Sequence, residues 1–243
     1  HFYADRLAAG FLRTNARTSE GLVPIRDHTR LPLVDLNKKG GDMAPLHLFV
    51  SAVNLTRSRD LARRDRKADH FVFSSLFCGS TTTGYIPTAE YRGGHTTVAH
   101  AMAISGAAFG TGTGIYTSVG QAFSRTLFNL RLGWWIDNPR YYRKVIYGPA
   151  IVPPPYDRPD QYLDERRAQG ERGVFWPSYL GREMMASTDA RRRLVNVSDG
   201  SHTGDNLGLY PLLLRRAGVI IVLDAGHDPD FSFFALAENV RLI

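Results

Sequence analysis

The sequence contains a single cysteine, Cys78, so it cannot form an internal disulfide. With one cysteine it also lacks the paired Cys/His framework that zinc-binding modules require. No run of about 18 apolar residues occurs, so no segment has the pattern of a membrane-spanning helix. Residues 93–124 contain no Asp, Glu, Lys or Arg, but Gly, Thr, Ser, His and Gln interrupt them throughout. This stretch is typical of chain that is buried in protein or lines a groove.

The overall composition excludes a generally disordered chain. Of the 243 residues, 43% are hydrophobic and 22% are charged, close to the averages of globular proteins. This length suits one large domain or two small ones. The 30 Lys and Arg exceed the 23 Asp and Glu, which gives a formal net charge of +7. Such an excess suits an anionic partner, either a phospholipid surface or nucleic acid, and does not choose between them.

Apolar runs and turn residues divide the chain into expected elements. Apolar runs predict strands at residues 46–55, 70–77, 194–198 and 219–223. Helical patterns cover residues 96–109, 118–132, 181–186 and 208–217, and a last helix starts near Phe234. Residues 1–45 have little periodicity and are expected to be an irregular lead-in, and the proline-rich, charged residues 148–173 are expected to form a loop. Strands that alternate with helices predict an α/β fold with a central, largely parallel sheet flanked by helices.

Two of the expected strands end in an aspartate followed by a turn. Asp199 precedes Gly200 and Ser201, and Asp224 precedes Ala225 and Gly226. Ligands of α/β sheets bind at the carboxyl ends of the strands, so Asp199 is the candidate functional carboxylate. We interpret Asp224 as structural, because an aspartate at such a position often binds neighbouring backbone amides.

Several motifs resemble the catalytic domain of bacterial patatin-like phospholipases, which belong to the superfamily of the cytosolic phospholipases. They are N-L-T-R-S-R-D-L at 54–61, F-C-G-S-T-T-T-G-Y at 77–85, A-M-A-I-S-G-A-A at 101–108, R-L-G-W-W-I-D-N-P-R at 131–140, N-V-S-D-G-S-H-T-G-D-N-L-G-L-Y-P at 196–211 and I-I-V-L-D-A-G-H-D-P-D-F at 220–231. They occur in the family's order and cover about residues 45–243.

The resemblance implies a patatin-like α/β fold and a lipid acyl hydrolase with a Ser–Asp dyad. Its substrate would be a glycerophospholipid or another acyl ester, and neither a metal nor a cofactor would be needed. Asp199 matches the family's general base, and Gly200 and Ser201 complete a D-G-S motif where the family has D-G-G or D-G-A. A serine hydroxyl attacks an ester when a positioned base accepts its proton. In a Ser–Asp dyad the aspartate is that base.

The family's nucleophile elbow, G-x-S-x-G, is missing from the sequence, as is a glycine-rich loop for the oxyanion hole. In the family both precede the matched part. Residues 1–243 are therefore expected to be the C-terminal portion of one catalytic domain, inactive when expressed alone. Ser105, in A-I-S-G-A, has Ala103 where an elbow needs glycine, and we interpret it as helix packing.

The sequence also suggests a partner and a location for the protein. The basic residues at 57–67 and the pair Trp134 and Trp135 are expected to face a membrane. The resemblance implies a bacterial protein that is cytoplasmic or peripheral at the membrane, with no specific nucleic acid bound.

Two other functions remain open. The first is a metal-dependent hydrolase that uses the loops 199–205 and 224–230, with His202, Asp205, His227 and Asp228 as ligands. The second is a non-catalytic module that binds an anionic membrane or nucleic acid through its arginines.

Overall fold

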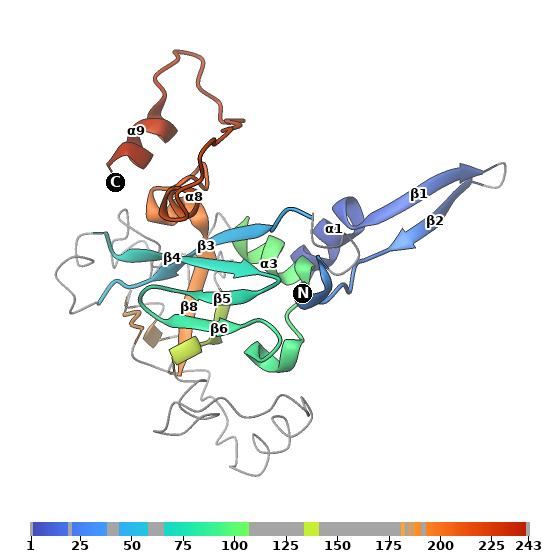
Figure 1. Ribbon diagram of the computed structural model, residues 1–243, viewed down its shortest axis with the longest axis horizontal. Helices are drawn as coiled ribbons and strands as arrows, with labels where there is room; N and C mark the ends of the chain where they lie inside the picture. The colour runs from blue at the N-terminus through green and yellow to red at the C-terminus, as the bar shows by residue number, and fades with distance from the viewer. Residues whose placement is uncertain are drawn as a thin grey trace, which may run out of the picture.

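A six-stranded sheet forms the centre of the protein (Figure 1). The computed structural model describes residues 2–18, 21–37, 44–57, 66–106, 134–140, 181–182, 185, 187–190 and 193–241. The sheet consists of β3 (Leu48–Asn54), β4 (Ala68–Ser74), β5 (Phe77–Ser80), β6 (Gly84–Pro87), β7 (Trp134–Asp137) and β8 (Leu194–Asp199). Their order across the sheet is β6-β5-β4-β3-β8-β7.

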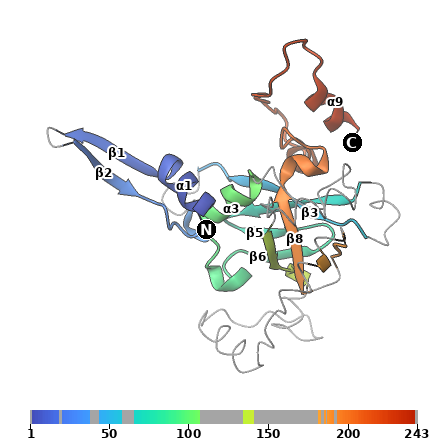
Figure 2. The ribbon, with the colours of Figure 1, turned by 180° about the vertical axis from the view of Figure 1, so that it is seen from behind.

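The remaining described elements surround this sheet. They are α1 (Phe2–Phe11), β1 (Arg13–Thr18), β2 (Gly21–Asp27), η1 (Leu33–Asp35), η2 (Tyr91–Gly94), α3 (Val98–Ser105), η4 (Gly200–Thr203), α8 (Tyr210–Leu214) and α9 (Phe234–Val240). The β1–β2 hairpin extends away from the sheet on one side, and α8 and α9 lie beyond one end of β8 (Figures 1 and 2). Residues 1–45, expected to be irregular, thus hold a helix and a hairpin.

The expected parallel sheet is wrong, because every pairing within the six strands is antiparallel. Short connections explain two of the five pairings, β4 with β5 and β5 with β6. Two residues, Ser75 and Leu76, separate β4 from β5, and residues 81–83 separate β5 from β6. Connections this short can join antiparallel neighbours only, whereas a parallel pair needs a crossover of a dozen residues or more. The sheet is therefore not that of the patatin-like α/β fold.

Most of the expected elements that fall on described residues are present. β3 and β8 lie where apolar runs predict strands, and α9 begins at Phe234. The helix predicted at 208–217 is shorter, from Tyr210 to Leu214. Residues 219–223, predicted as a strand, form neither helix nor strand. The expected helix at 118–132, the expected loop at 148–173 and residues 58–65 lie outside the described residues.

The two faces of the sheet differ in chemistry. Val53 of β3 lies opposite Val197 of β8, and both belong to the buried apolar core. On the other face the buried Asn54 donates hydrogen bonds from Nδ2 to Asn196 Oδ1 at 2.7 Å and to Ser198 Oγ at 3.0 Å. These bonds tie β3 to β8 just before β8 ends. The end of β8 is consequently fixed from both faces of the sheet.

Trp134, one of the two tryptophans expected to face a membrane, is half-buried. It packs against the buried core, and its ring contacts that of His100 edge-on at 5.2 Å between centroids. The described helices include none that is long and apolar enough to cross a membrane.

The lone cysteine is a buried core residue. Cys78 is 0% exposed, and its Sγ lies 3.3 Å from Thr88 Oγ1. Burial raises the pKa of the thiol to about 11, although hydrogen bonding to Thr88 and Ser74 acts in the opposite direction. We therefore expect no reaction with Ellman's reagent at pH 8 in the native state, and one equivalent of thiol after denaturation in guanidinium. Rapid reaction of the native protein would contradict this placement of Cys78.

Candidate functional site

The three residues expected to form the site lie in one turn at the end of β8. Asp199 is the last residue of β8 and the N-cap of η4. Its Oδ1 accepts a hydrogen bond from the backbone N–H of Ser201 at 2.8 Å. Asp199 is half-buried, and no hydrogen bond to its Oδ2 is found from any described residue. One carboxylate oxygen is thus held in place, while the other accepts no hydrogen bond from the described part of the chain.

Gly200 lets this turn lie directly against β3. A Cβ atom at Gly200 would stand 2.9 Å from the backbone oxygen of Val50 and 3.3 Å from its carbonyl carbon. Real Cβ atoms do not approach backbone so closely. Glycine is therefore required at this position by close packing.

Ser105 binds the same carbonyl. It is the last residue of α3, and its Oγ donates a hydrogen bond to the backbone oxygen of Val50 at 2.6 Å. This bond engages the hydroxyl proton that a nucleophile would have to give to a base. The contact gives Ser105 a packing role, between α3 and β3.

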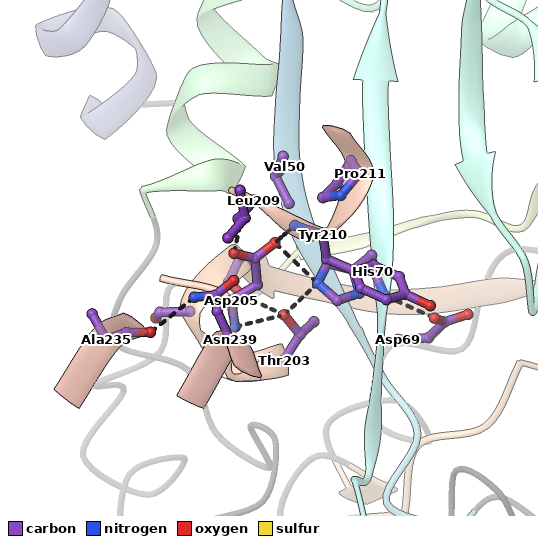
Figure 3. A network of polar contacts seen from close by, with 12 residues as sticks. Val50, Asp69, His70, Thr203, Asp205, Leu209, Tyr210, Pro211, Ala235 and Asn239 are labelled. Carbon is purple, nitrogen blue, oxygen red and sulfur yellow. Dashed lines mark hydrogen bonds and ion pairs between the residues drawn. The ribbon is translucent and has the colours of Figure 1, made fainter. Parts of the chain in front are cut away.

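A second set of polar contacts fixes the far end of η4 (Figure 3). Thr203 Oγ1 donates to the backbone oxygen of Gly200 at 2.8 Å and lies 3.0 Å from His70 Nε2. The His70 ring stacks on that of Tyr210, with centroids 4.5 Å apart and planes 20° apart. Because His70 belongs to β4, these contacts join the turn to a strand 133 residues away in sequence.

Asp205 lies at the centre of these contacts, and its side chain is fully buried. Its Oδ2 is 3.3 Å from His70 Nε2, and its two oxygens accept the backbone N–H groups of Leu209 and Tyr210 at 2.8 and 2.9 Å. Burial by itself raises the pKa of Asp205, but the hydrogen bonds that it accepts outweigh burial, and the pKa lies below its ordinary value of 3.8. Asp205 is thus an ionised carboxylate that holds the start of α8.

The arrangement of His70 is structural rather than catalytic. A relay of the Ser-His-Asp type uses both ring nitrogens, one for the carboxylate and one for the hydroxyl. Here Nε2 alone faces both Asp205 and Thr203. Since a carboxylate only accepts, Nε2 carries the proton and cannot take one from Thr203. No sequence signal pointed to His70, because its partners come from a distant strand end.

The proposed metal ligands do not come together. Among the described residues, no group of three or more His, Cys, Asp or Glu side chains is arranged to hold a metal ion. Asp205 is occupied as above, and Asp228 accepts the backbone N–H groups of Ser232 and Phe233 at 2.9 and 2.7 Å. His202 Nδ1 lies 2.8 Å from Ser198 Oγ. Asp205 and Asp228 thus bind backbone N–H groups that follow their loops, and His202 contacts a serine side chain of β8.

The comparisons with known proteins do not add to the geometry: no protein-family model, no curated protein and no solved structure matches the chain.

Proposed function

We propose that this chain supplies the general base of a serine acyl hydrolase that acts on glycerophospholipids or other acyl esters. The observation that carries the proposal is the turn at Asp199, in which Ser201 N–H fixes one carboxylate oxygen at 2.8 Å. The position of this turn is set by Gly200 against Val50 and by the Thr203 contacts. The sequence motifs favour the same assignment, although the antiparallel sheet is not the fold that a resemblance to patatin-like phospholipases implies.

The chemistry asked of Asp199 is a single proton transfer in each direction. Asp199 accepts the hydroxyl proton of a serine while the serine oxygen bonds to the ester carbonyl carbon. The proton then passes to the departing alcohol as the ester C–O bond breaks, which leaves an acyl-serine. Water cleaves the acyl-serine in the same manner and releases the fatty acid. A general base of this kind typically contributes a factor of about 10² to 10⁴ in rate.

The serine of this mechanism lies outside residues 1–243 in our proposal. The sequence contains no G-x-S-x-G motif, and the hydroxyl of Ser105 is bound to the Val50 carbonyl. The nucleophile and the oxyanion donors would come from another segment or another chain. Residues 1–243 alone are then expected to hydrolyse no ester.

The test is fluorophosphonate labelling and ester hydrolysis by the natural full-length protein and its Asp199→Asn variant. Asparagine keeps the oxygen that accepts the Ser201 N–H, so the turn survives while the base is lost. We expect hydrolysis and serine labelling to fall by a factor of about 10² or more.

Asp224→Asn is the matched control. Asp224 Oδ1 accepts the N–H of Gly226 at 2.8 Å, which is the same two-residue turn, but on an exposed loop. This variant should label and hydrolyse like the wild type. Equal labelling of the Asp199 variant, or the absence of any labelled serine in the wild type, would contradict the proposed function.

A further inference from the structure

Residues 219–223, Val-Ile-Ile-Val-Leu, form an apolar run in which every residue except the half-buried Ile220 is exposed to solvent. The exposed fractions of Val219, Ile221 and Leu223 are 84%, 83% and 89%. The run follows α8 and directly precedes Asp224, and it lies beyond the end of β8, away from the six strands (Figures 1 and 2). No backbone hydrogen bond joins it to another residue of the part of the chain that the structure describes. An apolar run so fully exposed marks a surface that another polypeptide or a lipid covers.

The composition of the run favours a β-strand as its bound form. Four of its five residues are Val or Ile, which prefer extended backbone because they branch at Cβ. Its N–H and C=O groups, which make no backbone hydrogen bond to the described residues, offer the main-chain hydrogen bonds by which an added strand binds. Apolar side chains would point to both faces of such a strand.

We propose that residues 219–223 pair with the same residues of a second copy of this chain, as antiparallel strands centred on Ile221. This register places Val219 opposite Leu223 and Ile220 opposite Val222, so that every position pairs two apolar side chains. An interface in which a segment pairs with itself is isologous and closes as a dimer. The proposal does not depend on the function of Asp199.

The charged residues that flank the run favour antiparallel over parallel pairing. The run is preceded by Arg215 and Arg216 and followed by Asp224 and Asp228. In antiparallel pairing the basic end of one copy lies beside the acidic end of the other, with Arg216 and Asp224 as diagonal neighbours. Parallel pairing would place like charges together at both ends, which is unfavourable.

The register can be tested by disulfide formation, because the native Cys78 is buried and has a pKa raised to about 11. The variants Val219→Cys and Leu223→Cys are oxidised with copper–phenanthroline, first separately and then as a mixture. We expect the mixture to form cross-linked dimers and each variant alone to form few, whereas Ile221→Cys should cross-link with itself.

The oligomeric state provides the second measurement. Light scattering after size exclusion should give a dimer for the wild type and a monomer for Ile221→Lys, with the same circular dichroism spectrum because the residue is exposed. A monomeric wild type overturns the proposal, whether the run then binds phospholipid vesicles or another polypeptide. Equal cross-linking of all cysteine combinations also overturns it, since it indicates association without register.

Discussion

Replacing Asp205 with alanine is expected to lower the free energy of unfolding by about 3 kcal/mol. The carboxylate belongs to a residue that is 2% exposed, and it accepts the backbone N–H groups of Leu209 and Tyr210. Alanine leaves these two donors without their acceptor and removes the carboxylate beside His70 Nε2, which keeps its contact with Thr203. A buried donor without a partner costs about 1–3 kcal/mol, so the two unpaired donors dominate the result. Urea denaturation followed by circular dichroism measures the change.

Asp205→Asn separates the charge of this carboxylate from its shape. The pKa of Asp205 is lower in the folded chain than its ordinary value of 3.8. The ionised group therefore contributes stability that is fully present above about pH 4 and is lost as the pH falls through the folded pKa. Asparagine does not titrate, so the stability of the variant should depend less on pH below about pH 4. A pH dependence as steep as that of the wild type would contradict the assignment.

Asp228→Ala is a control with the same geometry in a different environment. Asp228 accepts backbone N–H groups four and five residues ahead, from Ser232 and Phe233, as Asp205 does from its own neighbours. The Asp228 contacts are exposed, so water can replace the lost acceptor, and we expect little change in stability. An equal loss in both variants would show that burial of Asp205 is not the cause.

The positions of β3, β4 and β8 could be predicted from the sequence, but not the direction in which they pair. β3 and β8 are largely buried strands with apolar sequences, and such apolar runs are visible without a structure. β5 and β6 were missed because Thr81, Thr82 and Thr83 form a tight turn between two strands of four residues. The prediction of a parallel sheet had another cause: it rested on strands alternating with helices from residue 181 onward, and one of those strands, 219–223, does not form.

The candidate site, too, could be predicted from the sequence only in part. The turn at Asp199 could be predicted, because an aspartate followed by glycine at a strand end is a local pattern. The role of Asp205 could not, since its carboxylate binds N–H groups four and five residues ahead and a histidine from β4. The sequence suggested that Asp205 is a metal ligand. In the structure its carboxylate binds backbone N–H groups at the start of α8 instead. Local turn chemistry is readable from sequence, and contacts between distant strands are not.

Gly200→Ala is expected to lower the free energy of unfolding by about 2 kcal/mol, the usual cost of one extra carbon in a packed site. The new Cβ would lie 2.9 Å from the backbone oxygen of Val50, and backbone cannot rotate away as a side chain can. Either β3 or the turn must move, and movement of the turn displaces Asp199. Denaturation by urea measures the loss in stability.

Gly218→Ala is the matched control for this change. A Cβ at Gly218 would meet no atom within 4 Å, and the residue is exposed. The same glycine-to-alanine exchange restricts the unfolded chain equally at both positions, so the difference between the two variants isolates the contact with Val50. If Gly200→Ala is as stable as Gly218→Ala, the turn does not press on β3. The full-length Gly200→Ala protein should also hydrolyse esters more slowly, because the proposed mechanism needs Asp199 at a fixed distance from the serine.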